Sequence, residues 1–414
     1  MTENTRIFGL PADKGRWILV ALGLVMNLCL GTVYSWSVFR KPLEQMFEVG
    51  ATESGLPYML FLAFFAMLMP VAGRFLNRYG PKTVTILGGV VVGLGWILSS
   101  FANSMLLLNV TYGIIAGSGV GLSYGGPIAV STKWFPDRKG IAVGLTVLGF
   151  GLSPLLTAPL SKMSIDLYGP LQTFAILGVV FLVLLVLLSI PLKFPPSGWT
   201  PTGWKASQTS HSITDFETSK MIRTSTFYGL WVCYIIGTLS GLMAIGISSP
   251  VGQEVIKLSP AMAAIAVSVF AIFNGIGRPL FGWLTDRISP RYSAIIAFAI
   301  VFAASIGMLS AKEGTMILYI GCFIGFWLTL GGWLAIAPTA TPTFFGAKNN
   351  AKNYGVVFTA YGLGAILGTL TSGILRDMFG SYIQAFYPTA GLAIVGIVVA
   401  ILFLRPPRIP TVSK

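Results

Sequence analysis

The sequence predicts an all-α integral membrane protein with twelve transmembrane helices arranged as two six-helix halves. Of its 414 residues, 54% are hydrophobic and 10% are charged, whereas a soluble globular protein carries about 25% charged residues. Because a span needs about 20 apolar residues, the chain accommodates about twelve spans with their loops. Its 49 glycines suit closely packed membrane helices, and the alternation typical of transmembrane β-strands is absent. These observations exclude a soluble multidomain enzyme.

Apolar runs separated by charged residues, proline and glycine give the expected spans in order. The first run begins after Arg16 and is too long for the apolar part of a signal peptide, so we expect it to be the first span. The twelve spans are 17–38, 54–73, 83–101, 105–130, 140–160, 171–194, 227–250, 260–284, 292–310, 316–340, 353–375 and 383–404.

The distribution of positive charge predicts the orientation in the membrane. An even number of spans places both termini on one side, where the loops hold 20 Lys and Arg residues against 6 in the opposite loops. The positive-inside rule therefore predicts cytoplasmic termini for a multi-pass protein of the cell's inner membrane. The net charge of +14 then reflects topology, so no nucleic-acid partner is expected. The three cysteines lie inside apolar runs and indicate no disulfide framework.

Three pairs of similar segments indicate that the chain contains an internal repeat. GRFLNRYGPK (73–82) matches GWLTDRISPR (282–291), KWFPDRKG (133–140) corresponds to TFFGAKNN (343–350), and IDLYG (165–169) matches RDMFG (376–380). The offset stays between 209 and 211 residues, which is typical of parallel repeats related by an axis along the membrane normal. We expect an N-terminal domain at 1–194, a polar cytoplasmic linker at 195–226 and a C-terminal domain at 227–414.

Arg278 is the strongest candidate for a functional charge. Every acidic residue and 26 of the 27 basic residues fall in loops or at the ends of the expected spans, which leaves Arg278 alone inside one. A charge at the centre of a spanning helix costs about 2.5 to 3.5 kcal/mol, so it indicates function unless the side chain snorkels to the interface. No span offers an acid to pair with it, and a guanidinium matches a carboxylate with two parallel hydrogen bonds. The sequence therefore predicts an anionic substrate held by Arg278.

Other polar residues of the spans are candidates for the same cavity. Asn274 lies one turn before Arg278, where its amide can hold the guanidinium, donate to a substrate oxygen or join two helices. Tyr34, Tyr124 and Tyr361 can line a wet cavity, although a tyrosine is often an interface or helix contact. Leu28 and Leu145 are the expected apolar wall against a substrate methyl group.

The repeated loops after spans 2 and 8 are interpreted as cytoplasmic gates. Each combines a glycine, basic residues and a tight turn at a helix end, where a carboxylate can bind a helix N-terminus or an arginine. The alternative is that the charges only set the topology. The expected gate residues are Arg74, Asn77, Arg78, Asp286 and Arg287.

The repeated G-x-x-x-[DN]-R loops and the two six-span halves resemble the major facilitator superfamily over nearly the whole chain. Four segments are similar to the bacterial oxalate/formate antiporters and their monocarboxylate-carrier relatives: GTVYSW (31–36), KWFPDRKGIAVG (133–144), NGIGRPLFG (274–282) and AKNYGVVF (351–358). The resemblance implies that an anion binds between the two domains and that Arg278 matches the family's essential helix-8 arginine.

Two departures from the family pattern narrow the expected function. Oxalate carriers of this family place a second cation, a lysine, where this chain has Tyr361, and animal monocarboxylate carriers place an aspartate where it has Asn274. Burying two carboxylates against one arginine would leave one unpaired. We therefore expect a monomeric symporter of small monocarboxylates such as L-lactate or pyruvate, in which the substrate itself carries the proton. The alternative is an exchanger of the oxalate/formate type.

Other classes of function are disfavoured. The expected spans contain no histidine or acid that could serve as a general base or metal ligand, so neither an enzyme nor a cofactor or metal site is expected. A scaffold or sensor would lack an appended soluble domain. The only histidine, His211, lies in the linker, outside the membrane.

Overall fold

A computed structural model describes residues 5–202, 215–346 and 348–407, together with all side chains there except those of Asn77, Lys139 and Ala351. A short hairpin of β1 (Arg6–Ile7) and β2 (Leu10–Pro11) precedes the helices. The first group of helices is α1 (Ala12–Leu30), η1 (Gly31–Ser35), α2 (Trp36–Phe47), α3 (Ala51–Ser99), α4 (Met105–Leu108), η2 (Asn109–Ala116), α5 (Gly117–Ser123), α6 (Gly125–Trp134) and α7 (Lys139–Ser189). The second group is α8 (Thr218–Met221), α9 (Ser225–Glu254), α10 (Pro260–Ile288), α11 (Pro290–Leu309), α12 (Met316–Phe345), α13 (Asn350–Val357), α14 (Thr359–Phe379), η3 (Tyr382–Ala385) and α15 (Phe386–Phe403).

Two of these helices contain two membrane crossings each. Within α3 the backbone turns at Gly80, with φ 80°, and within α7 it turns at Gly169, with φ 82°. Glycine is suited to both turns because it has no Cβ to clash at positive φ. The described residues contain eleven helices long and apolar enough to span a bilayer. One of them, Gly140–Ser189, is 50 residues long, about 75 Å and enough for two crossings. The predicted all-α fold with twelve crossings is therefore confirmed.

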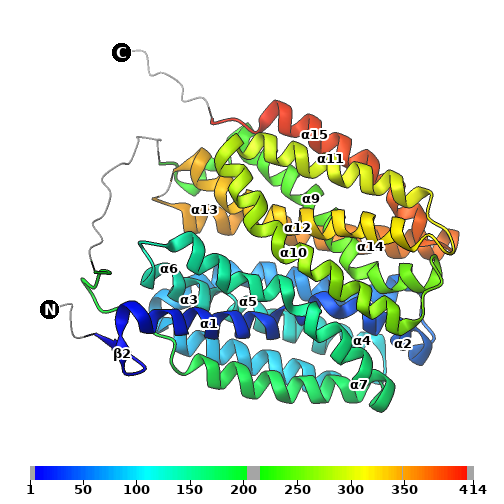
Figure 1. The fold of residues 1–414 in the computed structure, drawn as a ribbon, viewed down its shortest axis with the longest axis horizontal. Helices are drawn as coiled ribbons and strands as arrows, with labels where there is room; N and C mark the ends of the chain where they lie inside the picture. Colours follow the sequence, from blue (N-terminus) through cyan, green and yellow to red (C-terminus); the bar gives the residue numbers. More distant parts are fainter. Residues whose placement is uncertain (1–4, 203–214, 347, 408–414) are drawn as a thin grey trace.

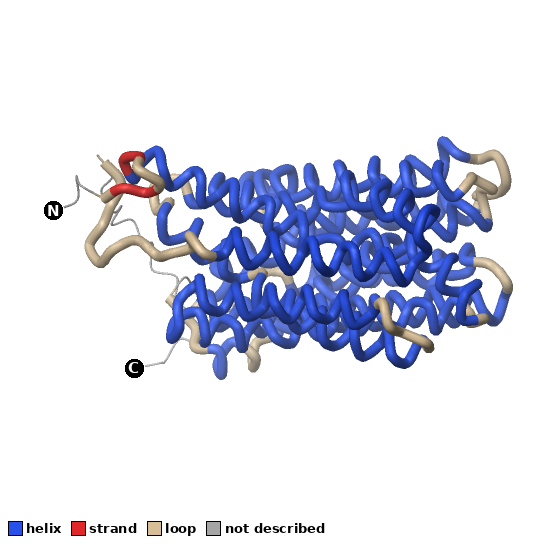
Figure 2. The backbone as a smooth tube through the Cα atoms, turned by 90° about the horizontal axis from the view of Figure 1, so that it is seen from below, coloured by secondary structure: helices blue, strands red, loops and turns tan. Residues whose placement is uncertain are grey.

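The helices run roughly along the long axis of the molecule (Figure 2). In Figure 1 the helices α1 to α7 occupy one side and α9 to α15 the other. The two sides meet where α3 packs against α14 and α7 packs against α10. The hairpin, α6, α13 and the end of α15 lie at the same end of the molecule (Figure 1). We call this the inner end and the opposite one the outer end.

The first span is longer than the expected 17–38, and this corrects one prediction. The helical segment continues from Ala12 to Phe47 and includes two buried guanidinium groups, those of Arg16 (5% exposed) and Arg40 (1% exposed). Because 36 helical residues extend about 54 Å, well beyond the roughly 30 Å of a bilayer core, the statement that Arg278 alone lies inside a span stays a prediction. The hydropathy pattern placed the ends of this helix too close together because it treats every charged residue as a boundary. Polar partners compensate the charges of Arg16 and Arg40, and a count of apolar residues does not reveal such partners.

Candidate functional site

Arg278 lies deep in α10. It stands ten residues before the end of the helix at Ile288, about 15 Å along the axis and half the thickness of a bilayer core. The side chain is 7% exposed. Nη1 donates to the carbonyl oxygen of Val147 in α7 at 2.8 Å, whereas Nε and Nη2 are buried without a partner among the described residues. The burial of this side chain and its hydrogen bond to Val147 weigh against snorkelling, and the unpaired edge can take an anion.

Asn274, one turn before Arg278, faces the site with its oxygen. Its Nδ2 donates to the carbonyl oxygen of Trp327 in α12 at 3.1 Å. Its buried Oδ1 has no hydrogen-bond donor within the part of the chain that the structure describes. The amide therefore makes the interhelical hydrogen bond that the sequence allowed with one of its two N–H donors.

Two glycines allow neighbouring helices to approach these side chains. A Cβ on Gly151 of α7 would lie 2.7 Å from Asn274 Oδ1 and 3.2 Å from Arg278 Nε. A Cβ on Gly331 of α12 would lie 2.1 Å from the carbonyl oxygen of Asn274. Distances below about 3 Å are not tolerated by packed atoms, so only glycine fits both positions without a shift.

The three tyrosines predicted to line the cavity belong to one aromatic cluster. The hydroxyls of Tyr34 in η1 and Tyr361 in α14 are 2.8 Å apart. Tyr34 and Tyr124 both pack on Phe150, with ring centroids at 5.1 and 5.3 Å, and Tyr361 packs on Phe65 at 5.8 Å. Each hydroxyl carries one hydrogen, so the Tyr34–Tyr361 pair keeps one O–H that is not used in their own bond.

The cluster adjoins the two polar residues of α10. Trp327, whose carbonyl oxygen holds Asn274, has its ring 6.4 Å from that of Tyr34. Phe150 precedes Gly151, the residue whose Cα borders Asn274 and Arg278. Polar groups from both sides of the molecule thus converge near Arg278. The sequence missed Gly151, Phe150 and Trp327, because nothing in their own patterns shows which helix they face.

The two leucines expected to form an apolar wall lie on α1 and α7. Leu28 in α1 is half-buried, and its carbonyl oxygen accepts a hydrogen bond from Ser153 of α7 at 2.6 Å. Leu145 is 37% exposed and stands two residues before Val147, the partner of Arg278. Their contact with a substrate remains a prediction.

Two of the sequence motifs have structural partners away from Arg278. Asp137 of the WFPDRKG segment accepts hydrogen bonds from Arg16 at 2.6 and 2.8 Å. These bonds lower the pKa of the Asp137 carboxyl, so the pair remains charged at neutral pH. Asn353 of the KNYG segment and Asn349 both donate to the carbonyl oxygen of Phe216 at 3.1 Å. This segment thus holds the residues that lead into α8.

Four of the five predicted gate residues at the inner end form no salt bridge with the residues that the structure describes. These four, Arg74, Arg78, Asp286 and Arg287, are exposed. The side chain of Asn77 lies outside the described residues. The guanidinium of Arg78 lies over Tyr79 at 5.2 Å and that of Arg287 over Trp283 at 5.8 Å. Their role as a gate remains a prediction.

The outer end, in contrast, is held together by charged side chains from both sides of the molecule. Glu254 at the end of α9 pairs with Lys41 of α2 and with Arg376 of α14. Asp377 of α14 accepts hydrogen bonds from the backbone N–H groups of Ala51 and Thr52 at 2.9 and 2.8 Å. We call the four side chains of Lys41, Glu254, Arg376 and Asp377 the outer latch.

Arg40 reinforces the same contact. Its Nη1 donates to the carbonyl oxygen of Gly246 in α9 at 3.2 Å, and its Nε donates to Ser54 Oγ at 3.0 Å. Nearby, the Tyr58 hydroxyl donates to the carbonyl oxygen of Leu242 at 3.1 Å. The two sides of the molecule are therefore closed at the outer end, while the predicted gate charges at the inner end form no ion pair with any described residue.

Removing the carboxylate of Asp377 is expected to open the outer end. Asp377→Ala takes a negative charge from the N-terminus of α3, where such a cap contributes about 1 kcal/mol. We expect spin labels at the exposed positions Gln45 and Met378 to shift toward longer distances by double electron–electron resonance.

Asp166→Ala is the matched control, because Asp166 occupies the equivalent position of the first repeat and pairs with Lys162 on its own helix. Equal distance distributions in the two variants would show that Asp377 does not hold the outer end closed.

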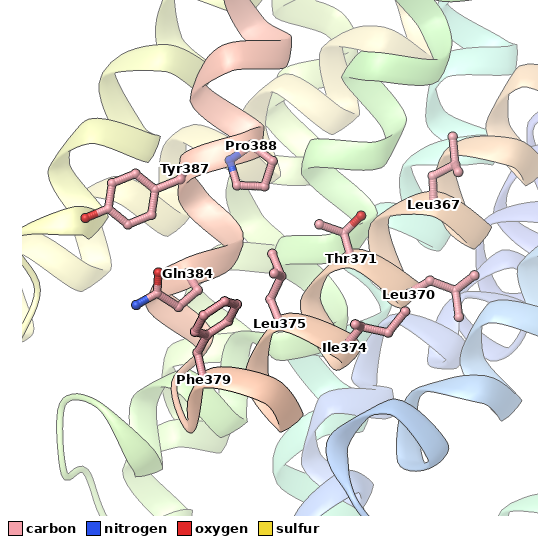
Figure 3. Close-up of a pocket in the computed structure, with 9 residues that line it drawn as sticks. All are labelled: Leu367, Leu370, Thr371, Ile374, Leu375, Phe379, Gln384, Tyr387 and Pro388. Atoms are coloured by element: carbon pink, nitrogen blue, oxygen red, sulfur yellow. The ribbon is translucent and has the colours of Figure 1, made fainter.

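One surface groove lies away from the candidate site. A groove of about 650 Å³ lies along the outer halves of α14 and α15, and Figure 3 shows its lining. It is lined by Leu367, Leu370, Thr371, Ile374, Leu375, Phe379, Gln384, Tyr387 and Pro388. None of these residues is among those predicted to bind substrate, and no charged side chain is among them.

Comparison with known proteins gives the family context. The sequence model of the Major Facilitator Superfamily matches residues 16–343 and 230–414. The oxalate:formate antiporter of Oxalobacter formigenes is 28% identical over 382 residues, covering 91% of this chain and 88% of the antiporter. Monocarboxylate transporter 13 of Rattus norvegicus is 26% identical over 395 residues, covering 93% of this chain and 88% of the relative.

A solved structure shares the fold. It is a bacterial homolog of the human lysosomal transporter Spinster in an inward-facing and unoccupied conformation, with a TM-score of 0.73. The match covers 97% of this chain and 99% of that chain at 16% sequence identity.

Proposed function

The chain belongs to the Major Facilitator Superfamily, and from this premise we propose that it carries small monocarboxylates of the lactate and pyruvate type across the cell's inner membrane. Transport proceeds by alternating access, with both termini in the cytoplasm. The chain acts as a monomer in the bilayer, and proton symport is the expected coupling. The similarity to monocarboxylate transporters along most of their length supports this substrate class.

The unpaired edge of Arg278 is the observation that carries the proposal. A guanidinium cannot lose its charge at any relevant pH. Its Nε and Nη2 are buried without protein acceptors in the described chain, which is costly until an anion arrives. A carboxylate offers two oxygens at the spacing of these two donors. Substrate binding therefore compensates a charge that the protein leaves uncompensated.

Tyr361 supports a substrate with one carboxylate rather than two. Its hydroxyl already contacts Tyr34, and the pair offers a neutral O–H where the resemblance places a lysine in oxalate carriers. A hydroxyl can bind the uncharged end of a short acid, but it cannot neutralise a second carboxylate. Oxalate is therefore expected to compete poorly.

Tyr361→Lys is expected to strengthen competition by oxalate against labelled lactate at least tenfold, because a close charge pair contributes upward of about 1.5 kcal/mol. Competition assays in proteoliposomes measure this change, and Tyr361→Phe separates the new charge from the lost hydroxyl. Oxalate that already competes better than lactate in the unchanged protein would contradict the proposed selectivity.

Proton coupling must proceed without an acid next to Arg278. Asn274 stands where the family resemblance places the aspartate of the D-x-x-x-R motif of animal monocarboxylate carriers. His211 lies outside the described residues. The substrate itself is the remaining carrier, since a carboxylic acid with a pKa near 4 can take up a proton in the cavity. In this mechanism Arg278 binds the deprotonated acid, and the loaded and empty carriers differ in charge at the site.

Exchange of carboxylates is the second candidate, and similarity to an oxalate:formate antiporter favours it. Uptake of labelled lactate into proteoliposomes distinguishes the two modes. An inward proton gradient should accelerate uptake by a symporter, whereas internal monocarboxylate should accelerate uptake by an exchanger. Acceleration by internal monocarboxylate alone would overturn the symport proposal.

A further inference from the structure

A second pocket of the molecule contains neither Arg278 nor any member of the outer latch. It has a volume of about 370 Å³ and lies at the outer end, where Figure 1 shows α2 and α4. We call it the outer pocket. Its lining comes from the end of α2, the first turns of α3, and α4 with its flanking residues: Phe47, Val49, Glu53, Leu56, Asn103, Ser104, Met105, Leu106 and Asn109. Because the expected span 105–130 begins here, the outer pocket lies where the outer leaflet meets water.

The helices around the outer pocket pack in a constant register. Three glycines of η2 and α5 each approach a carbonyl oxygen of α3. From an added Cβ to that oxygen the distances are 3.2 Å for Gly113 and Pro57, 2.5 Å for Gly117 and Phe61, and 2.8 Å for Gly121 and Phe65. The members of each pair are 56 residues apart in the sequence, a separation that parallel helices keep from one turn to the next. Glu53 and Asn109 have the same separation and form the next pair toward the outer end, so their backbones lie at the same level.

Glu53 and Asn109 both offer oxygen atoms to the outer pocket. Glu53 is exposed and forms no salt bridge within residues 5–202, 215–346 and 348–407. The buried Oδ1 of Asn109 accepts no hydrogen bond from any residue that the structure describes. Asn109 also begins η2, which is wound as a π-helix, a form that recurs at functional sites. A cation that donates hydrogen bonds would satisfy both side chains at once.

The rest of the lining determines which kind of cation fits. Glu53 is the only charged residue among the nine that line the outer pocket, whereas Ca²⁺ and Mg²⁺ take about six or more oxygen ligands. Five of the nine are apolar, and one of these, Leu106, is 74% exposed. A leucine exposed at the start of a span contacts acyl chains in a bilayer. A ligand that joins an ammonium group to an acyl chain therefore matches the outer pocket better than a metal ion or a soluble amine does.

We propose that the outer pocket binds an aminophospholipid of the outer leaflet, with its ammonium group between Glu53 and Asn109 and an acyl chain against Leu106. An acyl chain gains little on leaving the bilayer for an apolar wall, because the lipid around it is equally apolar. The headgroup therefore determines the selectivity. The primary ammonium of phosphatidylethanolamine carries three N–H donors, the quaternary ammonium of phosphatidylcholine carries none, and phosphatidylglycerol has no cation. This inference does not depend on which substrate the protein carries.

Three phospholipids with identical acyl chains test the proposal in the full-length protein. Native mass spectrometry of the purified, delipidated protein measures how tightly each one is retained. We expect phosphatidylethanolamine to bind about tenfold tighter than phosphatidylcholine, as one charge-assisted hydrogen bond provides, and phosphatidylglycerol to bind more weakly still. Equal retention of all three lipids would overturn the proposal. Glycerophosphoethanolamine has the same headgroup without acyl chains, so we expect it not to displace the lipid at equal concentration. Displacement by this compound would show that the outer pocket takes a soluble amine and would overturn the assignment to a lipid.

Glu53→Gln assigns the selectivity to the outer pocket, because it removes the charge at nearly constant volume. We expect the preference for phosphatidylethanolamine over phosphatidylcholine to fall about fivefold. Glu313→Gln is the matched control. Glu313 is also exposed, lies 210 residues after Asn103, which is the offset of the repeat, and does not line the outer pocket.

We expect the control to keep the preference of the unchanged protein. A preference that persists in Glu53→Gln, or one that falls equally in Glu313→Gln, would show that the ammonium group binds elsewhere. Asn109→Leu provides a second variant, in which the preference should also fall because the amide oxygen is lost. Should both variants of the outer pocket fail to fold, the comparison of the three lipids in the unchanged protein still decides the point.

Discussion

Arg278→Ala is expected to abolish monocarboxylate uptake. Truncating one partner of a desolvated charge pair costs about 2 to 5 kcal/mol, which corresponds to roughly 30- to several thousand-fold in affinity. Arg278→Lys should also impair uptake severely, because one ammonium group cannot hold the Val147 carbonyl and both carboxylate oxygens in the geometry of the fork. Initial rates of labelled lactate uptake into proteoliposomes, together with titration of lactate into the purified variants, measure both effects.

A control variant distinguishes the loss of the guanidinium at this position from the general loss of one positive charge. Arg223 is exposed near α8, so Arg223→Ala removes one charge on the same side of the predicted topology without touching the site. We expect its uptake to match that of the unchanged protein. Full uptake by Arg278→Ala at normal expression would show that the substrate carboxylate binds elsewhere.

Hydropathy predicts the fold well because membrane spans obey a simple physical constraint. In lipid every backbone polar group must be bonded within the segment, so a long apolar run becomes a helix with little dependence on its neighbours. The turns within α3 and α7 were also foreseeable as span boundaries, since Gly80 and Gly169 each precede a proline. The first span was misjudged because Arg40 and Lys41 look like a loop until their partners are known.

The candidate site is only partly accessible to sequence reasoning. Arg278 could be identified because a charge in an apolar run is visible in the sequence itself. The contact between Tyr34 and Tyr361 joins residues 327 positions apart, and no local pattern predicts such a pair. The orientation of the Asn274 amide likewise depends on its hydrogen bond to Trp327, a residue of another helix. Sequence therefore supplies candidate chemistry, whereas the packing of helices determines which atom faces the site.

Gly331→Ala is expected to disrupt the site without altering any side chain that contacts substrate. The added Cβ would lie 2.1 Å from the carbonyl oxygen of Asn274, so α12 and α10 must separate by about 1 Å to restore ordinary contact. Such overpacking typically costs about 1 to 3 kcal/mol of stability. The separation also lengthens the Asn274–Trp327 hydrogen bond and moves Trp327 relative to Tyr34, so lactate affinity should fall along with thermal stability.

Gly321→Ala provides the comparison on the same helix. A Cβ at Gly321 would meet no heavy atom of the described chain within 4 Å, so this substitution should leave stability unchanged or slightly raised. Thermal unfolding of the two variants in detergent measures the cost of overpacking, and lactate titration at a temperature where both are folded measures the effect on the site. If Gly331→Ala matched Gly321→Ala in both measurements, the close crossing of α10 and α12 would not be what positions Asn274.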